Sequence, residues 1–266
     1  MSMLILLPPS EGKAEAGAGR RLDLTKLSLP ELNPVREQVL AALLTLSAGP
    51  AEAALAALGL GSGQHGELRR NARLERAATA PAGRIYTGVL YEALDLATLP
   101  AAAQRAAARQ VLISSGLWGA VRLTDRIPPY RCPIGARLPG VAALPALWRP
   151  VLGPALTSAA GAGPVLDLRS GAYAAAWTPR GELAERTVTV RVLHEREVDG
   201  TPVRSVVSHF NKATKGRLVR DLLLHGVRPR SADALVGALR DLKYTVCEQP
   251  SAAGRPRQID VVVSAL

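Results

Sequence analysis

The sequence is short of aromatic residues, of cysteine and of long apolar runs. Phe, Trp and Tyr make up 3% of its 266 residues, while 48% are hydrophobic, so the core must be built from Leu, Val and Ala. Cys132 and Cys247 lie far apart and form no C-x-x-C pair, which excludes a disulfide framework and a cysteine zinc site. The apolar run Leu4–Leu7 follows no basic region and ends at Pro8. We therefore expect a cytoplasmic protein with neither a signal peptide nor a membrane span.

Patterns typical of metal and cofactor sites are missing as well. The four histidines are not spaced as ligands, and no Glu-x-x-His pair occurs. Residues 61–66 match G-x-G-x-x-G, but a helical segment precedes them where a dinucleotide site needs a strand. We read this segment as a connection between two helices, and we expect neither a cofactor nor a metal ion.

Acidic residues are outnumbered, and the excess of positive charge is local. The net charge is +11, with a pI of about 10.4. Residues 101–150 carry seven Arg against one acid, and residues 204–230 carry seven Lys or Arg against one acid. The rest of the chain is close to neutral. This balance favours a polyanionic partner, since cations that neutralise phosphates release counterions.

Apolar runs alternate with helix-forming segments along the whole chain. Strands are predicted at 4–7, 111–114, 165–169, 243–247 and 258–263. Helices are predicted within 34–58 with a break near Gly49, and at 68–78, 82–94, 101–110, 170–177, 212–225 and from about 231. Residues 120–154 are rich in Pro and Gly and are predicted to be largely irregular. The interleaving predicts one α/β (mixed α+β) domain over residues 1–266, built on a mixed sheet.

A β-hairpin is the clearest local signal. Apolar and polar residues alternate from Thr187 to Leu193, Asp199-Gly200 is a turn dipeptide, and the alternation returns from Val203 to Ser208. The predicted hairpin is followed in sequence by His209, Asn211, Lys212, Lys215 and Arg217. Cations at the start of a helix favour an anion there, because they otherwise oppose the helix dipole.

A second group of polar residues follows the strand predicted at 111–114. Ser115 and its glycine-flanked neighbours would let a ligand approach the backbone closely. Arg122 and Asp125 come next, and then Tyr130 and Arg131, a ring and a guanidinium suited to stacking on a base and contacting its phosphate. Together these residues predict a second anion-binding segment.

Several blocks in chain order resemble the peroxide stress protein YaaA family, also known as DUF328 or UPF0246. They are the first strand with Lys13, residues 86–92, residues 115–119 with Arg122 and Asp125, residues 129–131, Gly135 with Arg137, residues 168–173 and residues 208–217. The resemblance implies one compact α/β fold, a role in bacterial resistance to hydrogen peroxide, a link to lower free iron, and a positively charged cleft that binds DNA.

The resemblance and the local chemistry together give the predicted DNA- or anion-binding residues. These are Lys13, Tyr86, Ser115, Arg122, Tyr130, Arg131, Arg169, Ser170, Asn211, Lys212, Lys215 and Arg217. We expect DNA or a nucleotide as partner, no membrane, and a monomer.

Two functions stay open at this point. The first is a non-enzymatic stress protein that binds DNA through phosphate contacts. The second is an enzyme acting on a nucleotide, a nucleoside or a related small anion, for example by glycosidic-bond cleavage. Its candidate catalytic residues are Glu11, Asp125, Asp167, His209 and Lys215. An open groove as wide as a duplex would favour the first, and a closed pocket of ligand size the second.

Overall fold

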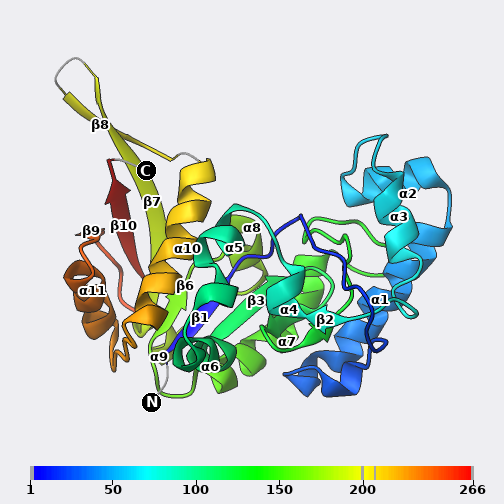
Figure 1. Cartoon of the computed structure of the whole chain (residues 1–266), viewed down its shortest axis with the longest axis horizontal. Coiled ribbons are helices and arrows are strands. Elements are labelled where there is room, and N and C mark those ends of the chain that lie inside the picture. Colours follow the sequence, from blue (N-terminus) through cyan, green and yellow to red (C-terminus); the bar gives the residue numbers. More distant parts are fainter. Residues whose placement is uncertain (1–2, 199–200, 207, 265–266) are drawn as a thin grey trace.

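A mixed eight-stranded sheet runs through the centre of the protein (Figure 1). The computed structural model describes residues 3–198, 201–206 and 208–264. Along the sheet the strands are β4 (Gly119–Arg122), β3 (Val111–Ser115), β1 (Leu4–Leu7), β6 (Val165–Asp167), β7 (Thr187–Val198), β10 (Arg257–Val263) and β9 (Thr245–Glu248), with β8 (Thr201–Ser205) paired to β7. A separate two-stranded ladder joins β2 (Ala80–Pro81) and β5 (Arg126–Ile127).

The five central strands are parallel and the edge strands are antiparallel. β1 pairs in parallel with β3 and β6, β6 with β7, and β7 with β10. β4, β8 and β9 pair antiparallel with β3, β7 and β10. β1 is buried at every residue, as expected for a continuous apolar run covered on both faces of a parallel sheet.

The order of the strands creates a topological switch point between β1 and β6. From β1 the chain moves to β3 on one side, whereas from β6 it moves to β7 on the other. The loops that leave these two adjacent strands therefore diverge. In open α/β sheets, ligands bind in the crevice formed where the connections diverge in this way.

Helices cover the sheet and build a lobe beyond it (Figure 1). The lobe holds α1 (Asn33–Ala48), α2 (Ala51–Leu58) and α3 (His65–Asn71). The others are α4 (Ala82–Ile85), α5 (Val89–Leu94), α6 (Ala101–Gln110), α7 (Leu144–Ala160), α8 (Gly171–Ala176), α9 (Glu182–Glu185), α10 (Ser208–Leu224) and α11 (Ala232–Asp241). α10 packs on α5, α6 and β7, and one apolar core extends from Met3 to Val261.

The predicted mixed α/β fold is confirmed, and so are most of its elements. The helix break falls at Gly49-Pro50, residues 61–66 connect α2 to α3, and β7 and β8 form the predicted hairpin. Its turn residues, 199 and 200, lie outside the described part of the chain. No helix among the described residues is long and apolar enough to cross a membrane.

Three predicted boundaries were wrong. Residues 128–143 are irregular as predicted, but the prediction for residues 120–154 missed β5 and the first part of α7, a helix with Pro150 and Pro154 in its interior. Proline disfavours a helix locally, but Trp148, Leu152 and Leu156 are buried at four-residue spacing, and this packing overrides the local preference. α3 ends at Asn71 instead of reaching 78, and α10 starts at Ser208 rather than 212. His209 thus lies in the first turn of a helix and not at the end of a strand.

Candidate functional site

The switch point carries a cavity of about 690 Å³, which we call the switch-point pocket. The loops after β1 and β6 form its floor, and the starts of α5 and α10 with β7 complete it. Its lining residues are Pro8–Gly12, Thr87–Tyr91, Arg169–Gly171, Tyr173, Val190, Arg191, Asn211, Lys212 and Lys215. The volume lies within the usual range for small-molecule sites.

Lys215 is the most unusual charge in this pocket. Its side chain is buried, with 8% of the residue exposed, and its Nζ donates a hydrogen bond to the Leu168 carbonyl over 3.1 Å. Asp167 is close enough to act on the charge, but its carboxylate already binds Arg169, whose Nε and Nη2 lie 2.9 and 2.6 Å from the two oxygens. Burial lowers the pKa of Lys215, since a cation is poorly solvated there.

Some of the neighbouring polar groups form hydrogen bonds or ion pairs within the protein, and others do not. Arg191 binds the buried Asp260 through two 2.7 Å contacts. Lys212 is exposed and makes no hydrogen bond or ion pair with the described residues. The Oδ1 atom of Asn211 is buried and has no hydrogen-bond partner among the described atoms. The pocket therefore presents two lysines without an ion pair to a described acid and one acceptor without a described hydrogen-bond partner.

A smaller hollow of about 360 Å³ adjoins the pocket and shares Glu11 with it. Arg131 and Arg137 line it, together with residues 56–59 at the end of α2. Glu11 Oε2 lies 3.1 Å from Arg131 Nε, so this predicted catalytic carboxylate forms an ion pair. Arg137 is exposed, and its side chain has no partner among the residues described.

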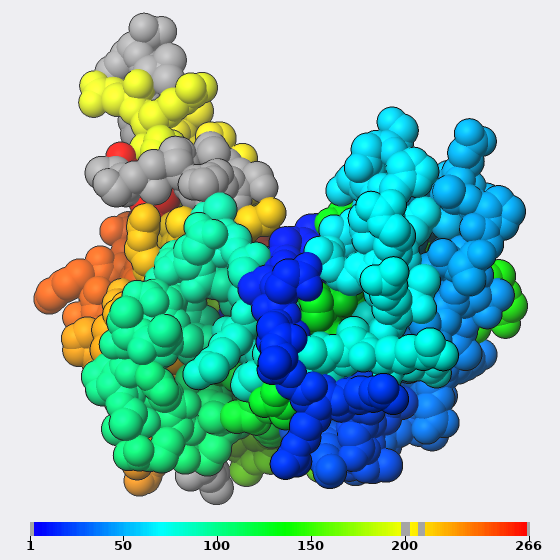
Figure 2. All heavy atoms as spheres, turned by 45° about the vertical axis from the view of Figure 1, so that its right-hand side comes forward, coloured from blue at the N-terminus to red at the C-terminus, as the bar shows by residue number. Residues whose placement is uncertain are grey.

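A broad cleft separates two parts of the molecule (Figure 2), and residues of both parts line the two cavities. The hairpin β7/β8 and α10, yellow to gold in the figure, form one wall. The lobe with α2 and α3, light blue to cyan, forms the other, and the dark blue segment after β1 lies at its foot. Glu11 lines both cavities, so the switch-point pocket with Lys212 and Lys215 adjoins the hollow with Arg131 and Arg137.

Four of the predicted residues form a buried polar chain beside the cleft. The Tyr86 and Tyr130 hydroxyls lie 2.8 Å apart, and Ser115 Oγ lies 2.6 Å from the Tyr130 hydroxyl. Lys13 Nζ lies 4.4 Å from the centre of the Tyr130 ring and donates to the Ser10 carbonyl over 2.9 Å. Desolvation lowers the pKa of Lys13 to about 8, and it raises the pKa of both tyrosines.

The segment from Ser115 to Asp125 makes hydrogen bonds within the protein and does not line the switch-point pocket. Ser115 Oγ accepts from the Trp118 amide, and Asp125 accepts from Ser28 and from the Arg122 amide. The Arg122 guanidinium donates to the Arg109 carbonyl. Asp125 and Arg122 line neither the switch-point pocket nor the adjoining hollow, so the structure does not bring them to the cleft residues.

Some of the remaining predicted residues line the switch-point pocket, and others do not. Ser170 and Arg169 line the switch-point pocket, whereas Arg217 is exposed further along α10 and lines neither cavity. The backbone of His209 belongs to α10, but its side chain lies outside the described part of the structure. Cys132 is buried, and burial raises the pKa of its thiol to about 12, which leaves it unreactive.

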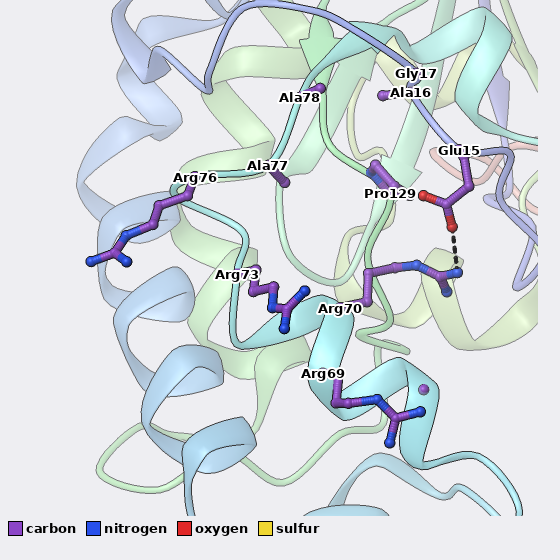
Figure 3. Close-up of a pocket in the computed structure, with 11 residues that line it drawn as sticks. Glu15, Ala16, Gly17, Arg69, Arg70, Arg73, Arg76, Ala77, Ala78 and Pro129 are labelled. Carbon is purple, nitrogen blue, oxygen red and sulfur yellow. Dashed lines mark hydrogen bonds and ion pairs between the residues drawn. The ribbon is translucent and has the colours of Figure 1, made fainter.

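A third cavity, the arginine hollow, lies in the lobe beside α3 (Figure 3). It measures about 620 Å³ and is lined by Glu15–Gly17, Gly66, Arg69, Arg70, Arg73, Arg76–Ala78 and Pro129. Arg70 is neutralised by Glu15 and Glu67 at 2.7 and 2.6 Å. Arg76 is directed away from the other three guanidinium groups.

Sequence reasoning missed the arginine hollow. Four arginines within residues 69–76 were the available signal, but Glu67 and Glu75 flank them and keep the local net charge modest. The structure separates these charges: Arg69, Arg73 and Arg76 are exposed, and no ion pair is formed by them with the described acids.

Comparison with known proteins identifies the family. The model of the family described as peroxide stress protein YaaA matches residues 3–249. The chain belongs to this family. UPF0246 protein SCO2297 of Streptomyces coelicolor is 58% identical to it over 98% of both chains. UPF0246 protein Cgl1995/cg2186 of Corynebacterium glutamicum is 38% identical over 94% of this chain and 96% of its own. The uncharacterized protein Cj0984 of Campylobacter jejuni is 29% identical over 82% and 83%. The YaaA resemblance predicted from the blocks is therefore confirmed.

Proposed function

We propose that this YaaA-family protein is a cytoplasmic peroxide-stress protein that binds DNA through the cleft between the hairpin and the helical lobe. The observation that supports the proposal is a pair of exposed, unneutralised cations in two cavities that share Glu11, with Lys212 in the switch-point pocket and Arg137 in the adjoining hollow. Phosphate contacts from opposite sides would hold a polyanion in the cleft.

Charge and shape favour a nucleic acid over a protein partner. The net charge of +11 gives long-range attraction for phosphates, and the cleft is a broad opening rather than a narrow slot (Figure 2). Contacts of this kind position a duplex without reading its sequence. We therefore expect binding that depends steeply on salt and little on base sequence.

The test compares two double variants that remove the same charge. Lys212→Gln with Arg137→Gln changes the cleft, whereas Arg105→Gln with Arg228→Gln changes exposed arginines that line none of the three cavities. If each cleft cation neutralises one phosphate, the negative slope of log affinity against log salt becomes shallower by about 1.8 for the first pair. The second pair should keep the slope of the unmodified protein. Fluorescence anisotropy with a blunt duplex between 50 and 200 mM salt is the measurement.

Two results would contradict the proposal. Equal slopes for both pairs would show that the cleft cations do not contact phosphates. A salt slope that becomes shallower only when Arg69 and Arg73 are changed to Gln would assign duplex binding to the arginine hollow instead of the cleft.

A further inference from the structure

The switch-point pocket contains positive charge for which the described fold supplies no counterion. Four cationic side chains line it, and two of these, Arg169 and Arg191, are bound by Asp167 and Asp260. Lys212 and Lys215 are left with no ion pair to a described acid. A buried ammonium without a counterion is costly, and so its presence needs a reason.

The two lysines are placed to act on one group. They stand three residues apart on α10, and side chains at this spacing lie on the same helix face. Lys215 uses one of its three N–H donors in the hydrogen bond to the Leu168 carbonyl. Two donors of Lys215 and all three of Lys212 remain for a ligand. Two adjacent positive charges match a dianion.

The rest of the lining suits a flat, polar body attached to that dianion. Tyr91 and Tyr173 are among the lining residues, and both are mostly buried. The unpartnered Oδ1 of Asn211 is an acceptor that a ligand N–H or O–H can satisfy. Rings and amide acceptors are the groups with which proteins hold an unpaired base or its sugar.

We propose that the switch-point pocket binds a nucleotide that carries a terminal phosphomonoester, with the phosphate on Lys212 and Lys215 and the nucleoside against the tyrosines and Asn211. A phosphomonoester carries a charge of about −1.5 to −2 at neutral pH, whereas an internal phosphodiester carries −1. Two lysines therefore favour a terminal phosphate over the backbone of an intact strand. The ligand is either a free nucleoside monophosphate or the phosphorylated end of a DNA strand.

This inference concerns a different ligand group from the duplex contacts proposed above, although Lys212 takes part in both. Backbone binding in the cleft needs Lys212, Arg137 and the open walls. Capture of a phosphomonoester needs the interior of the pocket, on the α10 side of Glu11.

Isothermal titration calorimetry at 200 mM salt tests the pocket with five probes. They are a nucleoside 5′-monophosphate, the same nucleoside, inorganic phosphate, and a single-stranded oligonucleotide with either a 5′-phosphate or a 5′-hydroxyl. We expect the monophosphate to bind at least about 10-fold more tightly than the nucleoside or phosphate alone. If the pocket receives strand ends, the 5′-phosphate should strengthen oligonucleotide binding by a similar factor. No such gain means that the free nucleotide is the ligand.

Three single variants locate the binding. Lys212→Gln and Asn211→Ala each remove a polar group without a hydrogen bond or ion pair to the described fold, so both should fold normally and bind the monophosphate about 10-fold more weakly. Lys243→Gln, an exposed lysine outside the three cavities, is the matched control and should bind normally. Lys215→Met should abolish binding, provided its circular dichroism spectrum is unchanged.

The outcomes separate the two proposals. Equal binding of nucleoside and monophosphate, or unchanged binding by both Lys212→Gln and Asn211→Ala, overturns the phosphomonoester site. A duplex with 5′-hydroxyl ends that binds with the predicted salt slope leaves the cleft proposal standing in that case. Monophosphate binding that persists when duplex binding fails refutes the cleft proposal alone.

Discussion

Replacing Arg36 by Met should destabilise the protein more than almost any other single change at an ionisable residue. Arg36 is fully buried in α1. Its Nε donates to the Trp118 carbonyl at 3.0 Å, and Nη2 donates to the Ser28 and Ala120 carbonyls, both at 2.8 Å. Met fills a similar volume but donates nothing. The Ser28 and Ala120 carbonyls then lose this donor at once, and the Trp118 carbonyl keeps the Ala120 amide at 2.9 Å.

The size of the effect follows from those contacts. Each buried acceptor left without a donor costs about 1–3 kcal/mol, and removal of the buried cation itself relieves part of this. Desolvation already lowers the pKa of Arg36 to about 10, which shows that its charge is poorly solvated. We expect a net loss of about 3–5 kcal/mol in the free energy of unfolding. At about 2–4 °C per kcal/mol for a chain of this size, the Tm should fall by about 6–20 °C.

Urea and thermal unfolding followed by circular dichroism measure this loss. Arg105→Met, on the exposed side of α6, is the control and should change stability by less than about 0.5 kcal/mol. Arg36→Lys should fall in between, because an ammonium keeps the charge but cannot match the geometry of the guanidinium fork. A loss below about 1 kcal/mol for Arg36→Met would refute the view that this side chain holds the turn at Trp118.

Two further predictions concern stability. The folded state holds the pKa of Lys13 at about 8 instead of 10.5, so between these pH values the unfolded chain binds more protons and the free energy of unfolding rises with pH. Lys13→Met should remove up to about 3 kcal/mol of that rise, measured by urea unfolding at pH 7 and pH 10. An identical rise in both proteins would contradict this prediction. Gly216→Ala should destabilise by about 1–3 kcal/mol, because its Cβ would overlap the Leu90 carbonyl where α10 meets α5. Gly237→Ala in α11 meets open space and should stabilise by about 0.5–1 kcal/mol, and equal Tm shifts of the same sign would refute this packing argument.

The fold was predictable where the signal is local. Apolar runs identified β1 and β3, alternation identified the hairpin, and a Gly-Pro pair identified the break after α1. α7 was not predictable in this way. Its interior prolines oppose a helix, and the burial that stabilises it depends on partners such as the Gly116 carbonyl, which accepts from Trp148 Nε1 at 2.9 Å. Contacts across about 30 residues leave no trace in a local pattern.

The glycine-flanked turn after β3 shows that one local pattern can have two different physical causes. Small residues permit close approach, but here the approaching groups belong to the protein itself. A Cβ on Gly116 would overlap the Cys132 carbonyl, and Gly119 has a φ of +71° with the Trp148 ring against it. The predicted lysines of α10, in contrast, do line the pocket. The sequence cannot separate these cases, since the difference lies in what packs against each residue.

The distribution of acids explains which cations remain for a ligand. Asp167 binds Arg169, Asp260 binds Arg191 and Glu11 pairs with Arg131, so each of these carboxylates is used to hold a guanidinium in the fold. Arginine suits such pairs because its planar fork matches a carboxylate at two points. The lysines of α10 receive no such partner among the described acids. Burial lowers the pKa of Lys215, and an anion that enters the pocket should raise this pKa again, because it pairs with the charged form.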